Sequence, residues 1–178
     1  TLCGVLMLPM APAPARALDA MSFATPGAGD DLRDTLVNAS LLIGARKDKQ
    51  VDPQNLFASA RADYAKLLGA LYSEGYYSGT ISILIDGREA ATIAPLDAPS
   101  RISKIEVIVK PGPRFTFSAA RMKPYARGTK LPPDYRDTLT AKSTAIVDAA
   151  QAGVDGWRNI GHAKAHVAGQ SVVADHNT

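Results

Sequence analysis

The sequence predicts an α+β protein built as a tandem of two small units, each with the order strand, helix, helix, strand, strand. Three observations support this prediction. The hydrophobic period changes from about 3.6 to 2 at Tyr76. The hairpin dipeptide Asp86-Gly87 directly follows the alternating run Thr80–Ile85. A helix-ending pattern recurs at Gly75 and Gly161. A chain of 178 residues, 46% hydrophobic and 21% charged, is long enough to fold as two small units.

Residues 1–17 have the pattern of a partial secretory signal peptide. The apolar run Leu2–Met10 is followed by small residues that end at Ala15 and Ala17, as at a signal cleavage site. The run is too short to span a bilayer. The alternative, a hydrophobic helix of the fold, is disfavoured by three prolines. The only cysteine, Cys3, lies inside this segment, so we expect an exported chain without disulfides or cysteine metal sites.

The charges do not indicate a nucleic-acid partner. The formal net charge is +3 and the pI is about 9.0, but the basic residues are scattered along the chain. The densest group, Arg46–Lys49, contains Asp48 and no aromatic residue. Nucleic-acid-binding domains concentrate Lys and Arg on one face, so we expect no such partner here.

The first unit is predicted to cover residues 30–112, after a linker or short first strand at residues 18–29. Within residues 18–29 the only strand candidate is Met21–Ala24. Helical spacing of apolar residues predicts a first helix from Asp30 to Gly44. Asp52-Pro53, an N-cap followed by proline at the first helical position, predicts a second helix that stops at Gly75.

Two clear strands, with a return strand between them, follow in the first unit. Along Thr80–Ile85 an isoleucine stands at every second position, and the Asp86-Gly87 turn predicts a return strand through Arg88–Ala94. Ile105–Val109 alternates in the same way and must end at the prolines of Pro111–Pro113.

The second unit is predicted to cover residues 113–178. We expect a short strand around Phe115 and Phe117, a helical stretch at Tyr135–Leu139, and a helix from Ser143 to Gly161 that leads into a strand. The repeat relates Leu71, Gly75 and Tyr76 to Trp157, Gly161 and His162, an offset of 86 positions. The same offset moves the strand centred on Val107 to about position 193, so the second unit is expected to lack its last strand.

The element order and several segments resemble POTRA domains. Tyr72–Tyr77, Ile81–Gly87 and Ile105–Phe117 resemble the first POTRA domain of TamA-like proteins, the outer-membrane subunits of the translocation and assembly module. Gly161–Ala165 and Val172–His176 resemble parts of the next POTRA domain. The resemblance covers the chain from about Asp30 to its end.

The resemblance implies a function in outer membrane protein assembly. Members of this family carry periplasmic POTRA domains ahead of a transmembrane β-barrel, so the chain would be a fragment without its own barrel. It would act in the periplasm, attached to the cell outer membrane. Its partners would be unfolded outer-membrane and autotransporter client polypeptides and a TamB-like periplasmic protein. No enzyme activity and no cofactor are expected. A POTRA pair of a two-partner secretion transporter is the alternative within this class.

The candidate binding site is the predicted strand at residues 80–85. An edge strand offers unpaired N–H and C=O groups to an extended partner, which is the basis of β-augmentation. The residues that would bind a client in this way are Thr80, Ile81, Ser82, Ile83, Leu84 and Ile85. The competing interpretation is that the return strand at Arg88–Ala94 covers this edge.

A hypothesis from a different class is a small exported metal-binding protein or hydrolase that uses His162, His166 and His176. The four-residue spacing of the first two suits a metal only within one helix, and Gly161 ends the helix before them. Adjacent residues such as Asp175-His176 point to opposite faces of a strand. The sequence also lacks a nucleophile motif. We therefore predict no catalytic, cofactor-binding or metal-binding residues.

Overall fold

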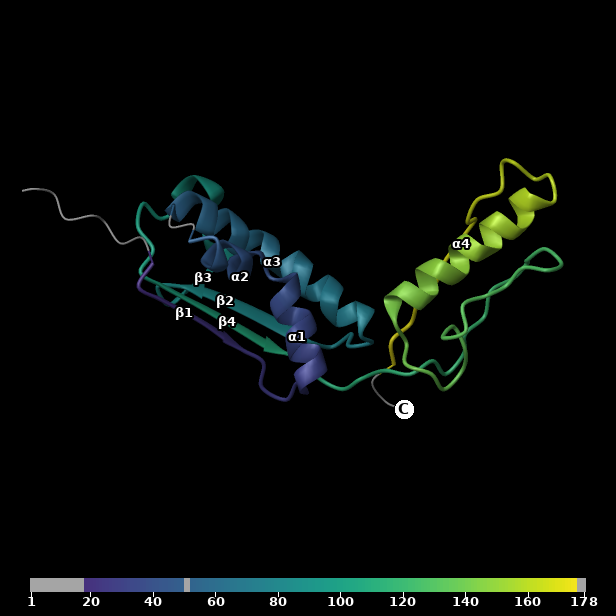
Figure 1. Ribbon diagram of the computed structural model, residues 1–178, viewed down its shortest axis with the longest axis horizontal. Coiled ribbons are helices and arrows are strands. Elements are labelled where there is room, and N and C mark those ends of the chain that lie inside the picture. Colours follow the sequence, from purple (N-terminus) through teal and green to yellow (C-terminus); the bar gives the residue numbers. More distant parts are fainter. Residues whose placement is uncertain (1–17, 50–51, 176–178) are drawn as a thin grey trace, which may run out of the picture.

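The computed structural model describes residues 18–49 and 52–175, which form a mixed α+β structure with a four-stranded sheet and four α-helices (Figure 1). This confirms the predicted α+β class. The predicted signal peptide with Cys3, and His176 at the other end, lie outside the described residues. We call residues 18–112 the N-terminal part and residues 113–175 the C-terminal part.

The sheet has the strand order β1-β4-β2-β3. Its strands are β1 (Ala20–Ala24), β2 (Thr80–Ile85), β3 (Arg88–Glu89) and β4 (Lys104–Lys110). β4 is parallel to β1 and antiparallel to β2, and β3 is antiparallel to β2. Of the two alternatives for residues 18–29, the short strand is the one observed.

The alternation within β4 explains its central position. Ile105, Val107 and Val109 are all fully buried, whereas the residues between them lie on the other face of the sheet. The neighbouring strands follow this pattern, since Phe23 of β1 and Ile83 of β2 both lie opposite Val107. One face of the sheet therefore supplies the core.

Helices α1 (Asp30–Ala39), α2 (Leu41–Lys47) and α3 (Pro53–Ser73) cover that face (Figure 1). The predicted start of α3 is confirmed, because Oδ2 of Asp52 accepts a 2.9 Å hydrogen bond from the Asn55 N–H. Leucines of α3 such as Leu67 are fully buried against the sheet. Helix and sheet thus share one hydrophobic core.

The prediction of one helix from Asp30 to Gly44 was wrong, because the helix breaks at Ser40. Ser40 has an extended backbone, and its hydroxyl oxygen accepts a hydrogen bond from the Ile43 N–H, which starts a new helix. The buried Asp63 carboxylate of α3 then accepts from the Leu41 N–H at 2.6 Å. Hydrophobic spacing continues through this break, so periodicity alone does not reveal it.

The predicted hairpin turn is confirmed, with left-handed φ angles of 47° at Asp86 and 82° at Gly87. The return strand is shorter than predicted, since β3 ends at Glu89 and not at Ala94. The chain then turns into the 3₁₀ segments η1 (Ala90–Thr92) and η2 (Pro95–Asp97). Ala90, the first residue of η1, is fully buried in the core.

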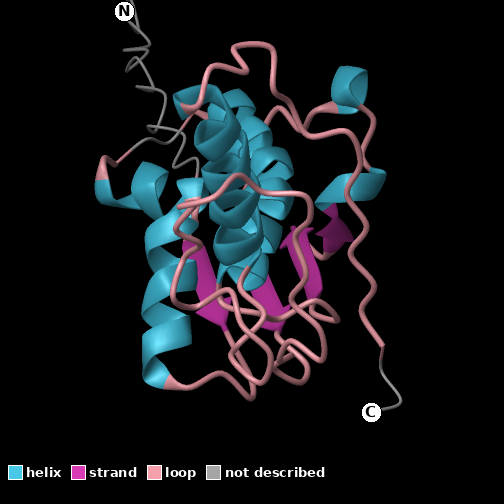
Figure 2. Cartoon of the chain, turned by 90° about the vertical axis from the view of Figure 1, so that its right-hand side faces the viewer, coloured by secondary structure: helices cyan, strands magenta, loops and turns pink. Residues whose placement is uncertain are grey.

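The C-terminal part contains one of the predicted elements in full, helix α4 (Ser143–Asn159). The helix predicted at Tyr135–Leu139 is wrong, because Thr138 has a φ of 70° and donates its N–H to the Phe117 carbonyl. The strand predicted at Phe115 and Phe117 is reduced to a single bridge between Thr116 and Thr140. After α4 the described residues 162–175 form no strand, and Figure 2 shows them as loop.

The two helix ends have the same geometry, but the predicted repeat fails beyond them, because no strand follows α4 in the described residues. Gly75 and Gly161 have φ angles of 84° and 102°. Tyr76 donates its N–H to the carbonyl of Leu71 at 2.9 Å, and His162 donates in the same way to Trp157 at 3.1 Å. Both helices therefore end in a Schellman motif. The parts diverge after these motifs, because β2 follows only the first.

Candidate functional site

One edge of the predicted binding strand β2 is only partly covered by another strand. β3 pairs with Leu84 and Ile85 alone. Along Thr80–Ile83, no strand of the described residues lies on that side of β2. The competing interpretation of a fully covered edge is therefore wrong for the first four residues of the strand.

Ile81 and Ile83 direct their backbone groups toward this edge. The N–H of Ile83 donates to Oε1 of Glu89 at 3.0 Å, so it points away from β4. Every second residue of a strand directs its N–H and C=O to the same side, so those of Ile81 point outward as well. Within the described residues the Ile81 backbone groups have no hydrogen-bond partner on that side.

A side-chain cluster around Glu89 covers the middle of the edge. The Glu89 carboxylate accepts hydrogen bonds from the Ile83 N–H, from the Ser82 hydroxyl at 2.6 Å and from the Tyr64 hydroxyl. The carboxylate stands where the carbonyl oxygen of an added strand would accept the Ile83 hydrogen bond. We call these groups the Glu89 latch.

The protonation states of the Glu89 latch follow from its hydrogen bonds. Burial raises the pKa of Glu89, but hydrogen bonds from Ser82, Tyr64 and Ile83 outweigh it and hold the pKa below the ordinary 4.5. Burial and the Glu89 carboxylate together raise the pKa of Tyr64 to about 12. At neutral pH a carboxylate anion thus accepts from a protonated phenol. Sequence reasoning missed this cluster, since Tyr64 on α3 and Glu89 after the hairpin meet only in three dimensions.

His162 and His166, the two described histidines of the alternative hypothesis, do not come together with other ligands. The His162 ring packs edge-on against Trp157, with the ring centroids 5.1 Å apart. Nδ1 of His166 lies 3.1 Å from the Lys164 carbonyl oxygen. In residues 18–49 and 52–175 no group of three or more His, Cys, Asp and Glu side chains could hold a metal ion.

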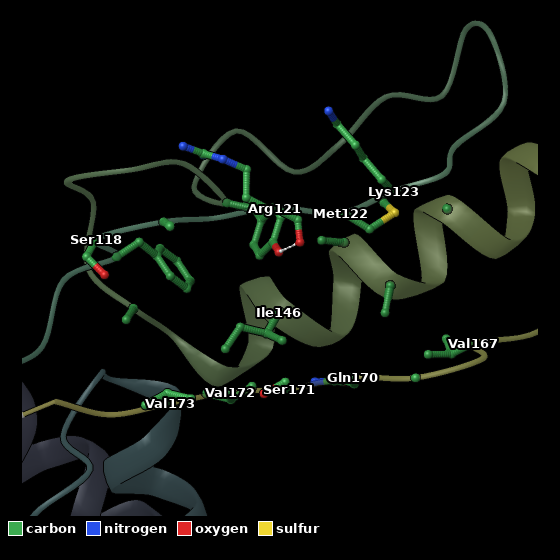
Figure 3. Close-up of a pocket in the computed structure, with 18 of the residues that line it drawn as sticks. Ser118, Arg121, Met122, Lys123, Ile146, Val167, Gln170, Ser171, Val172 and Val173 are labelled. Atoms are coloured by element: carbon green, nitrogen blue, oxygen red, sulfur yellow. Dashed lines mark hydrogen bonds between the residues drawn. The ribbon is translucent and has the colours of Figure 1, made fainter.

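A second concave surface, which the sequence did not indicate, lies in the C-terminal part (Figure 3). We call it the α4 groove. It has a volume of about 880 Å³. Residues 113–124 form one wall, the apolar side of α4 forms the floor, and residues 165–175 form the other wall. Small and apolar side chains, among them Ile146 and Val172, line much of it.

A dense junction joins the sheet to the α4 groove. The Phe115 N–H donates to the Gly75 carbonyl at 2.8 Å, and the Tyr77 hydroxyl donates to the Ala141 carbonyl at 2.7 Å. The Glu74 carboxylate lies 3.5 Å from Arg114 and 3.6 Å from Lys142. The end of α3 therefore holds both the start of the groove wall and the start of α4.

None of the helices in the described part of the chain is both long enough and apolar enough to cross a membrane. A scan against models of known protein families finds no match to this chain. A search of curated proteins likewise finds no matching sequence.

Proposed function

We propose that this chain is a non-catalytic, exported polypeptide-binding module of an outer-membrane protein assembly factor, made of POTRA-like units. It acts on the periplasmic side of the outer membrane. It binds unfolded outer-membrane and autotransporter clients, and it docks a TamB-like periplasmic partner. The clients add to the sheet as an extra strand beside β2.

The observation that carries this proposal is the open edge along Thr80–Ile83. Ile81 presents an N–H and a C=O without partners in the described residues, and Ile83 is covered by a side chain and not by a strand. An extended peptide that pairs with these two residues makes main-chain hydrogen bonds regardless of its sequence. Such binding suits a module that receives many different clients.

The Glu89 latch makes this binding reversible. A client carbonyl must displace the Glu89 carboxylate from the Ile83 N–H, and hydrogen bonds to charged groups contribute about 1.5–3 kcal/mol each. The client recovers this cost through its own backbone hydrogen bonds and through contacts with the exposed side chain of Thr80. We therefore expect weak affinity and rapid exchange of clients.

The order of elements in the N-terminal part also supports the POTRA-like assignment. A strand is followed by a helical layer and then by the antiparallel pair of β2 and β4, with β4 in the centre of the sheet. The helical layer differs from a simple pair of helices because of the break at Ser40. Without that break, α1 and α2 would be the single helix that the β-α-α-β-β order requires.

The test is an NMR titration of the chain with a synthetic peptide that alternates Val and Thr. We expect the largest amide shifts at Ile81 and Ile83. Ile81→Pro, which removes the outward N–H, should abolish these shifts. Ile81→Ala is the matched control, because it loses the same side chain and keeps the N–H. Equal binding by the two variants, or shifts that avoid β2, would overturn the proposal.

A further inference from the structure

We propose that Glu89 makes the β2 edge selective for client strands that carry a lysine or arginine opposite Ser82, on the face of the sheet away from the helices. This inference rests on the function proposed above, because it names the class of strand that binds at the same edge. Main-chain hydrogen bonds alone do not distinguish one strand from another. A single basic position adds a selection that many different clients can still satisfy.

Side chains cover both outward backbone groups of Ile83. Its N–H donates to Oε1 of Glu89 at 3.0 Å, and its carbonyl accepts from the Tyr64 hydroxyl at 3.4 Å. A carboxylate oxygen and a hydroxyl thus occupy the two places that the C=O and N–H of an added strand residue would take. A client residue that pairs with Ile83 must displace both side chains.

The two covering side chains come from opposite faces of the sheet. Tyr64 belongs to α3, in the layer of helices that covers one face (Figure 1). Glu89 lies opposite Leu84 in the β2–β3 pair, and residues paired in this way share a face. Leu84 alternates with the buried Ile83 and Ile85, so its face is the one away from the helices. A client strand beside Ile83 therefore runs between Tyr64 and Glu89.

The client strand removes two of the three hydrogen bonds that the Glu89 carboxylate accepts. The Ile83 N–H turns to the client, and the client backbone separates the carboxylate from the Tyr64 hydroxyl. The Ser82 hydroxyl, 2.6 Å from Oε2, remains on the same face as Glu89. Within residues 18–49 and 52–175, Glu89 forms no ion pair. The displaced carboxylate therefore lacks donors just where the bound strand excludes part of its water.

The client residue opposite Ser82 is placed to supply a new donor. β3 pairs with Leu84 and Ile85 alone, so the client begins beside Ile83 and continues the line of β3. On this line the residue opposite Ser82 is two positions from Glu89, and residues two apart point to the same face. Two positions span about 7 Å. A lysine or arginine side chain reaches the carboxylate across this distance.

The charges on this face favour a cation at that position. Glu106 of β4 also lies opposite Leu84, so carboxylates stand on both sides of Leu84. Lys104 neutralises Glu106 through an ion pair of 2.9 Å, whereas Glu89 has no such partner among the described residues. A basic client residue meets an unpaired carboxylate here, and an acidic one meets a like charge. The carboxylate that opposes a neutral strand thus attracts a cationic one.

The test compares versions of the alternating Val and Thr peptide in the NMR titration. One central threonine is replaced by Lys, by Glu, or by Met, which is long and uncharged. We expect the Lys peptide to bind about threefold more tightly than the Met peptide, as for a partly exposed ion pair. The Glu peptide should bind more weakly than either. The formal net charge of the chain is +3, so its overall charge favours the Glu peptide and cannot produce this order.

Two variants locate the selection at Glu89. Glu89→Gln keeps an acceptor near the Ile83 N–H and removes the charge, so it should bind the Lys and Met peptides equally well. Glu106→Gln is the matched control, because it removes a carboxylate from the same face that Lys104 already neutralises. This control should keep the preference for Lys. A preference that persists unchanged in Glu89→Gln would overturn the inference.

The same titration separates this inference from the proposed function. Shifts at Ile81 and Ile83 with the parent peptide, together with equal binding of the Lys and Met peptides, would overturn the selectivity and leave the β2 edge as a binding site. Shifts of β2 amides with none of the peptides would overturn the proposed function, and the selectivity with it. Binding of the Lys peptide with shifts that avoid β2 would overturn both as well.

Discussion

The Ser40 hydroxyl donates a 2.6 Å hydrogen bond to Oδ2 of Asp63, which joins the break between α1 and α2 to the middle of α3. Both side chains are buried, with 5% and 0% of their surface exposed. The same carboxylate accepts from the N–H groups of Leu41 and Leu42. One acidic side chain therefore satisfies the first turn of α2 from a different helix.

Asp63→Ala should lower the free energy of unfolding by about 3 kcal/mol, because it leaves two buried donors, on Ser40 and Leu42, and the part-buried Leu41 N–H without their acceptor. Urea denaturation followed by circular dichroism measures this. The control is Asp52→Ala at the exposed N-cap of α3, which should cost about 1 kcal/mol. A loss for Asp63→Ala no larger than for Asp52→Ala would contradict the role of the buried carboxylate.

The Glu89 latch should make stability depend on pH in the acid range. The pKa of Glu89 in the folded chain lies below its ordinary 4.5. At pH values between this lowered pKa and 4.5, the unfolded chain therefore binds more protons than the folded chain. The contribution of Glu89 is therefore complete above pH 4.5 and is lost as the pH falls through the lowered pKa. Glu89→Gln should flatten this part of the urea stability profile. An unchanged slope in Glu89→Gln would show that other carboxylates cause it.

Glu89→Ala should strengthen peptide binding at the β2 edge several-fold, because the client no longer competes with a carboxylate for the Ile83 N–H. The measurement is the NMR titration with the alternating Val and Thr peptide. Glu106→Ala is the matched control, since Glu106 lies on β4 and forms an exposed ion pair with Lys104 at 2.9 Å. Weaker binding by Glu89→Ala would mean that Glu89 contacts the client directly.

Gly75→Ala should destabilise the chain more than Gly161→Ala does. Both glycines have left-handed backbones, so each substitution carries a backbone cost of about 1 kcal/mol. At Gly75 an added Cβ would also lie 2.7 Å from Cγ2 of Thr140, whereas at Gly161 it would meet nothing within 4 Å. The difference between the two variants in thermal unfolding measures the packing of the junction. Equal losses would show that the junction adapts without cost.

Local signals in the sequence predicted much of the N-terminal part. The alternation at Thr80–Ile85, the Asp86-Gly87 turn and the Asp52 cap each act over a few residues, and each is found in the structure. The break at Ser40 escaped prediction because it depends on Asp63, a residue distant in the sequence. β1 was hard to identify because its partner in a parallel pair, Lys104–Ile108, lies even farther away in the sequence.

The C-terminal part was predicted less well, for physical reasons. α4 has a clear apolar side and was found, but the segment around Thr138 takes a left-handed turn that its composition does not reveal. The Glu89 latch and the α4 groove each combine residues from separate elements. Such sites depend on tertiary packing, which periodicity and spacing do not describe.

The parallel pairing of β1 with β4 also determines the order in which the sheet can form. Ala20 lies opposite Lys104, so β1 is among the first described residues to be synthesised and the last to find its neighbour. The β2–β4 pair and the helices above it involve shorter separations in sequence and should form earlier. β1 therefore has no partner strand while most of the N-terminal part is being synthesised. A nascent chain held at that stage should be captured by chaperones through β1, and release should coincide with completion of β4.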